Sequence, residues 1–238
     1  MKKNFKLIIV IVVAIGVFAN LIYTRSPLSG PRFFDGETYL RLASYSRDLV
    51  ISGPFRFYEI KANGDVKVTS SITSGKKGTF NLLQITGPAQ LEDVNIEHLE
   101  LTGSLDCKKG IIKKYNVIGP AILANVKIDE MVQTGSLEVD ELTADNALII
   151  GSANMKYSIV KQLNITADTI VLEDSQIDQI TIKATDTNAK QTITLLGETI
   201  IAQDIIFESG TGEVVVKSNK VRMQNVVGGK RIDQPASS

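Results

Sequence analysis

Five glycines recur at a constant interval of sixteen residues, and this spacing constrains the fold more than any other feature of the chain. They are Gly87, Gly103, Gly119, Gly135 and Gly151. Each glycine opens a similar stretch, and the aligned units begin TGPAQL, TGSLDC, IGPAIL, TGSLEV and IGSANM. A fixed period of this length indicates structural units that stack on one another to bury a shared core.

Apolar residues within each unit occur in pairs two residues apart, as in Ala121 and Leu123. This is the period of a β-strand, whereas a helix requires spacings of three and four. Equivalent positions stay apolar from unit to unit, and two such columns contain Leu91, Cys107, Leu123, Val139 and Met155, and Ile96, Ile112, Ile128, Ala144 and Val160. We therefore predict an all-β protein, a single-stranded parallel β-helix or triangular β-solenoid of about 16 residues per turn. Equivalent residues of successive turns would then lie about 4.8 Å apart.

Charged residues fall between the apolar columns, and residues one turn apart often differ in sign. The pairs are Glu92 and Lys108, Asp93 and Lys109, Glu97 and Lys113, His98 and Lys114, Asp140 and Lys156, and Asp145 and Lys161. Opposite charges on neighbouring strands contribute roughly 0.2–1 kcal/mol each, and like charges oppose pairing. These pairs favour one register of stacking, and a ligand-binding patch on the lysine-rich turn is the alternative interpretation.

The N-terminal segment, residues 1–24, has the composition of an export signal. Lys2, Lys3 and Lys6 precede an apolar run that starts at Leu7, as in secretory signal peptides. Continued to Tyr23, the run approaches the roughly 17–25 residues that span a bilayer, so a cleaved signal peptide and a retained membrane anchor both remain open. In either case the lysines favour a cytoplasmic N-terminus. The rest of the chain is expected to be exported across a bacterial inner membrane, as a periplasmic, membrane-anchored, secreted or surface protein.

The composition divides the rest of the chain into three parts. Residues 25–53 lack the period and are expected to form a linker or an N-terminal cap. Residues 54–228 are expected to form the solenoid, which begins near Phe55 and contains an Asn63-Gly64 step that suits a hairpin or a corner. Beyond Ile165 the pattern slips by about one residue. Residues 229–238 are polar and are expected to be a disordered tail.

No residue pattern indicates catalysis, a cofactor or a metal. The chain has one histidine, one cysteine and no tryptophan, and its formal net charge is zero. The single histidine, His98, falls in an outward column and suits a surface residue. Cys107 aligns with Leu91 and Leu123 and suits a buried core thiol. The carboxylates Glu138, Asp140 and Glu141 could cluster, with a solvated face as the simpler interpretation, and the balanced charge argues against nucleic-acid partners.

The glycine-led turns and the endings FESGTGEV and VVGGK resemble the bactofilins, polymer-forming bacterial proteins built as triangular β-solenoids. The resemblance covers roughly residues 80–228. It implies a non-enzymatic β-solenoid that assembles with copies of itself.

The expected function is that of an exported, non-enzymatic structural or interaction scaffold in a bacterial cell envelope. Its expected partners are further copies of the chain, bound through the solenoid ends or faces, an envelope component, and the inner membrane if the leader is retained. A surface or secreted adhesin-like binding module is the alternative. A polysaccharide-active β-helix enzyme ranks below both, because arginine is absent between Arg56 and Arg222.

Overall fold

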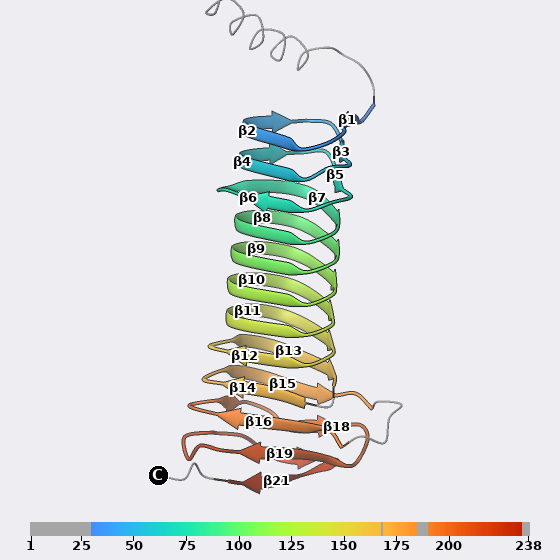
Figure 1. Cartoon of the computed structure of the whole chain (residues 1–238). Coiled ribbons are helices and arrows are strands. Elements are labelled where there is room, and N and C mark those ends of the chain that lie inside the picture. The colour runs from blue at the N-terminus through green and yellow to red at the C-terminus, as the bar shows by residue number, and fades with distance from the viewer. Residues whose placement is uncertain (1–29, 168, 185–189, 235–238) are drawn as a thin grey trace, which may run out of the picture. The chain divides into compact units, whose positions relative to one another are not determined.

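The structure is a computed structural model that describes residues 30–167, 169–184 and 190–234. The chain divides into two units, residues 1–31 and residues 32–238. The leader predicted for residues 1–24 lies outside the described residues. The second unit is a parallel β-solenoid of about 12 turns, with about 17 residues per turn (Figure 1). The predicted fold class is therefore confirmed. The part of the chain that the structure describes has no helix of the length and apolar character needed to cross a membrane.

Every strand pairs in parallel with strands of the neighbouring turns. The strands are β1 (Arg32–Phe34), β2 (Thr38–Tyr45), β3 (Leu49–Ile51), β4 (Phe55–Ala62), β5 (Val66–Val68), β6 (Ile72–Ser74), β7 (Gly78–Thr86), β8 (Ala89–Thr102), β9 (Leu105–Ile118), β10 (Ala121–Thr134), β11 (Leu137–Ile150), β12 (Ala153–Lys156), β13 (Ile159–Thr166), β14 (Thr169–Glu173), β15 (Gln176–Ile182), β16 (Thr192–Leu196), β17 (Ile200–Ile201), β18 (Ile205–Phe207), β19 (Gly212–Val216), β20 (Val226–Val227) and β21 (Gly229–Asp233). In the central turns one strand follows almost the whole coil, as β8–β11 do.

Burial alternates along each central strand and changes phase twice per turn. In β8 the inward residues form three pairs, which are Ala89 and Leu91, Val94 and Ile96, and Leu99 and Leu101. Each phase change marks a bend, so the turn has three short faces that surround one apolar core. Leu91 pairs with Cys107 and Cys107 with Leu123, as the predicted column requires.

The turns are sixteen residues long in the centre and longer elsewhere. Ala121 pairs with Leu137, whereas Thr38 pairs with Phe55 at the start and Ala153 with Ile170 after the predicted slip. Between Leu196 and Ile200, for example, the chain has one residue more than between their partners Glu173 and Gln176, and the inward columns continue on both sides.

The solenoid begins before Phe55 and continues past residue 228. Strands β1–β3 pair with β3–β5, so residues 32–51 form turns of the coil where we expected a linker or cap. Strand β21 pairs with β19, so residues 229–233 form a strand of the last turn, beyond the boundary at residue 228 that we predicted for the solenoid. Both segments place charged residues in inward columns, which hides the alternation from a hydropathy pattern. The Asn63-Gly64 step is a corner between parallel strands, not a hairpin.

Candidate interaction surface

The five repeat glycines stack at one corner of the solenoid, and backbone contact between turns requires glycine there. Their φ angles lie between 125° and 147°, a region that other residues rarely adopt. A Cβ atom on Gly119 would lie 2.0 Å from the carbonyl oxygen of Gly103. The Gly119 N–H donates to the Thr134 carbonyl at 2.8 Å. The corner is thus filled by backbone alone.

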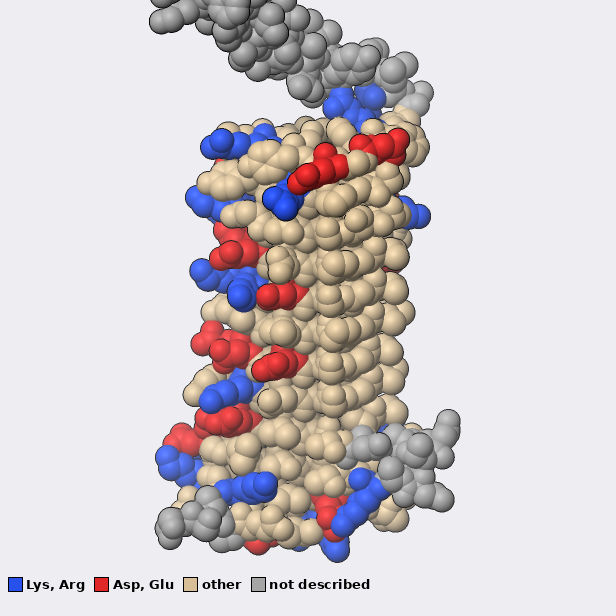
Figure 2. Space-filling model, in the orientation of Figure 1, with Lys and Arg blue, Asp and Glu red and all other residues tan. Residues whose placement is uncertain are grey.

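Three neighbouring columns of uncharged residues run along this corner, one of them the glycines, and we call these columns the glycine-corner band. They contain Thr86, Thr102, Ile118, Thr134, Ile150 and Thr166; Gly87, Gly103, Gly119, Gly135 and Gly151; and Pro88, Ser104, Pro120, Ser136 and Ser152. Two earlier turns extend it as Ser52-Gly53-Pro54 and Thr69-Ser70-Ser71. Figure 2 shows charged side chains concentrated along one side of the column and an uncharged surface on the side where β8–β11 end in Figure 1.

Apolar side chains lie exposed on and beside this band. Ile118 and Ile122 are 52% and 50% exposed, and Ile150 and Val132 lie nearby. A shallow hollow of about 260 Å³ flanks the corner beside Thr102 and Ile118. Another of about 450 Å³ lies beside Pro120 and Ile122. The corner therefore forms a ridge between two grooves, with aliphatic groups exposed to solvent.

The charged columns form part of the predicted ladder. Lys113 binds Glu97 and Lys161 binds Asp145, each at 2.7 Å, as predicted. Lys156 faces Asp140 in register but binds Glu173 of the following turn at 3.2 Å. All of these pairs are exposed, so each contributes little to stability and serves mainly to favour the register.

His98 and the three carboxylates are surface residues, as their columns predicted. His98 is half-buried, and its Nε2 lies 3.4 Å from a Glu100 carboxylate oxygen. Glu138, Asp140 and Glu141 are exposed, and Glu141 accepts a hydrogen bond from Asn125 at 2.7 Å. Within the described ranges no group of three histidine, cysteine or acidic side chains is placed to hold a metal ion.

The core of the central turns contains a buried polar pair beside the predicted thiol. Cys107 is fully buried, and burial raises its pKa to about 12. Tyr115 and Gln133 are also buried, and the Tyr115 hydroxyl donates to the Gln133 side-chain oxygen at 2.7 Å. The Gln133 amide in turn donates to the Gly119 carbonyl at 2.6 Å. Burial also raises the pKa of Tyr115 well above its ordinary value. This network ties the core to the glycine corner.

A second corner carries a column of left-handed residues that are not glycine. Asp93, Lys109, Asn125, Glu141 and Tyr157 have φ angles between 49° and 64°. Beside them lies a hollow of about 650 Å³ lined by Lys109, Ile111, Asn125, Lys127, Glu141 and Tyr157. The phase change in the apolar pattern places a bend here, but the residues at the bend share no chemistry that would indicate a left-handed backbone.

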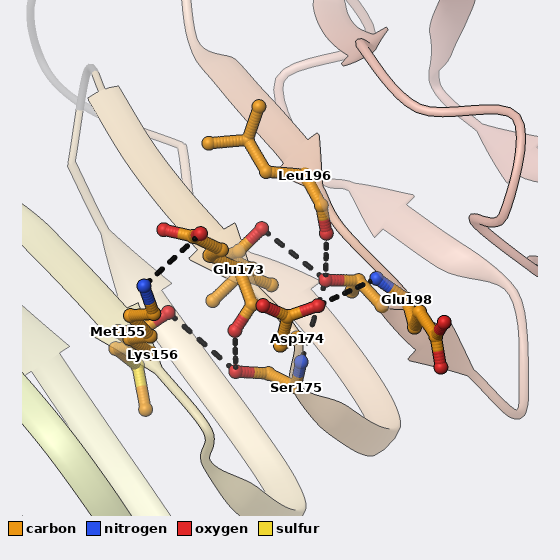
Figure 3. Close-up of polar contacts among 9 residues, drawn as sticks. Met155, Lys156, Glu173, Asp174, Ser175, Leu196 and Glu198 are labelled. Atoms are coloured by element: carbon orange, nitrogen blue, oxygen red, sulfur yellow. Dashed lines mark hydrogen bonds and ion pairs between the residues drawn. The ribbon is translucent and has the colours of Figure 1, made fainter.

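Hydroxyl groups replace apolar side chains beside this second corner in the later turns. Ser175 donates to the Glu173 carbonyl at 2.7 Å, and the Ser175 N–H donates to the Thr199 hydroxyl at 3.4 Å. The Asp174 carboxylate accepts the Glu198 N–H at 2.8 Å, as Figure 3 shows. These contacts satisfy backbone groups where the turns lengthen, so we assign this cluster to the stability of the coil.

The glycine-corner band was not identified in the sequence, although a signal for it was present. The aligned triplets Thr-Gly-Pro, Thr-Gly-Ser, Ile-Gly-Pro and Ile-Gly-Ser lack charge in every unit, and this absence of charge is the signal. Comparisons with protein-family models, with curated proteins and with solved structures gave no match to this chain.

Proposed function

We propose that this protein is a non-enzymatic structural or interaction scaffold of a bacterial cell envelope. The observation that carries the proposal is the glycine-corner band, a long uncharged surface on a column whose charged side chains concentrate on another side (Figure 2). Contiguous uncharged surface with exposed aliphatic groups is typical of sites where proteins associate. The proposal shares with the bactofilins the use of a β-solenoid as an assembling unit.

Export rests on the N-terminal sequence, whose lysines and apolar run have the form of a signal peptide or an anchor. The test is to express the full chain, fractionate the cells, and determine the N-terminal residue of the mature protein. An intact Met1 in the inner-membrane fraction supports a tethered scaffold. A new N-terminus near Asn20 supports a free periplasmic or secreted protein, and recovery of the whole protein from the cytoplasm would contradict export.

An adhesin-like binding module is a second candidate, and the hollow beside the left-handed corner favours it. Tyr157 is half exposed there, and the Lys156 amino nitrogen lies 4.9 Å from the centroid of the Tyr157 ring. An exposed aromatic ring beside amide and amino groups suits polar ligands such as glycans. Labelling of intact cells with a membrane-impermeant reagent separates the two, because a periplasmic scaffold stays unlabelled.

A further inference from the structure

Both ends of the solenoid place charged residues in columns that are otherwise apolar. At the first turn Arg32 stands over Leu49, and that column continues through Val66 and Leu83. The Arg32 guanidinium lies 5.9 Å from the centroid of the Tyr45 ring. Arginine thus occupies a place that leucine and valine fill in the next turns.

The last turn has the same feature. Arg231 continues the column of Ile193 and Val214, and Asp233 continues the column of Leu195 and Val216. Arg231 and Asp233 bind each other at 2.8 Å and remain largely exposed. A further turn stacked on either end would bury these charges, which costs several kcal/mol per ion. Inward charges of this kind protect sheet edges from adding strands.

End-to-end stacking is therefore disfavoured, and the sides of the column remain as the surface for association. The glycine-corner band runs over eight turns from Ser52 to Thr166, a height of about 34 Å at the usual strand spacing. With its flanking columns it is about 15 Å wide. Two such bands in contact would bury roughly 1,000 Å² in total, which is about the minimum for a specific interface and suits a weak dimer.

We propose that two copies of the chain pair side by side through their glycine-corner bands, an inference that rests on the proposed scaffold function. Successive turns have the same spacing along the axis in both copies. The ridge of one copy can therefore fit beside the grooves of the other along the whole band. The band itself carries no charge, and the exposed Ile118, Ile122 and Ile150 would be covered. Asp106 and Glu138 share the flanking column of Ile122, so they would stay solvated at the rim of the contact. Each copy has one such band, so the contact closes as a two-fold dimer and does not propagate.

Cysteine cross-linking in the full chain tests the pairing. Cys107 is the single native cysteine and is fully buried, so an introduced thiol is the accessible one. We compare Ile118→Cys, on the band, with Ile159→Cys on another face; the two isoleucines are 52% and 53% exposed. Intact cells are treated with a flexible, membrane-permeant bismaleimide, and the products are identified by mass. We expect a dimer severalfold more abundant for Ile118→Cys than for Ile159→Cys.

A charge variant checks that the band itself forms the contact. In an Ser136→Cys background, Ile118→Lys places like charges on both copies across the two-fold axis and should reduce the dimer severalfold. The matched change Ile159→Lys should leave it unchanged.

Equal dimer from both faces, or more from Ile159→Cys, would overturn the pairing while leaving a self-associating scaffold. A cross-link from Ile118→Cys to a different protein would also overturn it, because the occupant would not be a second copy. No cross-link from any variant would overturn the pairing as well, and together with cytoplasmic recovery of the protein it would contradict the scaffold function.

Discussion

Replacing Gly119 with alanine should destabilise the solenoid far more than a typical surface substitution. Gly119 has a φ of 137°, and the added Cβ would lie 2.0 Å from the Gly103 carbonyl oxygen. Backbone held in a region that is nearly exclusive to glycine costs about 1–3 kcal/mol. The clash is with a backbone atom and adds to this cost, because a carbonyl oxygen cannot move aside without moving the main chain of its turn. We expect a loss of about 3 kcal/mol or more in the free energy of unfolding.

Urea denaturation followed by circular dichroism measures the loss. With a denaturant dependence of about 1–3 kcal/mol per molar urea, the midpoint should fall by roughly 1–3 M. Gly110→Ala is the matched control, since Gly110 has no positive φ and its added Cβ would meet the Cys107 sulfur at 3.0 Å. The Cys107 side chain must shift by a few tenths of an ångström to admit this methyl group, so the change should cost about 1 kcal/mol, at the low end for an added group in a packed core. A midpoint for Gly119→Ala equal to that of Gly110→Ala would refute the argument from the corner.

Three further outcomes are expected. Lys109→Asn should raise the melting temperature by about 1–4 °C in calorimetry, because asparagine tolerates the left-handed conformation that Lys109 adopts at φ 55°. Tyr115→Phe and Gln133→Leu should each cost about 1–3 kcal/mol, and the double variant should cost less than their sum, since each single change leaves a buried group without its partner; additive losses would contradict the network. Burial raises the pKa of the Cys107 thiol from 9.0 to about 12, so the folded protein keeps this proton to a higher pH than the unfolded chain does. The free energy of unfolding should therefore fall from pH 9 to pH 12. Urea midpoints at pH 7 and 10.5 should show a shallower fall for Cys107→Val, and an equal fall in both proteins would show that this thiol is not responsible.

The sequence was most informative where each turn repeats the same chemistry. The column of Leu91, Cys107 and Leu123 and the glycines were aligned correctly because apolar side chains and backbone contact leave little freedom at those positions. The ion pair between Lys113 and Glu97 followed from the same alignment.

The ends and the second corner could not be read in this way. Arg32 and Arg231 stand in core columns of the first and last described turns, so their charge suggested a linker and a tail. Lys109 and Tyr157 share a left-handed backbone and no side-chain property. The choice of ion-pair partner also depends on side-chain reach, and Lys156 binds Glu173 where the alignment offered Asp140.

The parallel pairing of successive turns determines how the column would carry load. Its hydrogen bonds run along the axis, from each turn to the next. A pull along the axis therefore loads the junctions between turns in series, and the tensile limit is that of the weakest junction rather than the average. Strand pairing thins toward the last turn, where β18 matches β20 at only Ile205 and Ile206 and β17 meets the next turn through the bridge of Ile200 to Arg222. The column would yield there first, while the long strands β8–β11 remained wound.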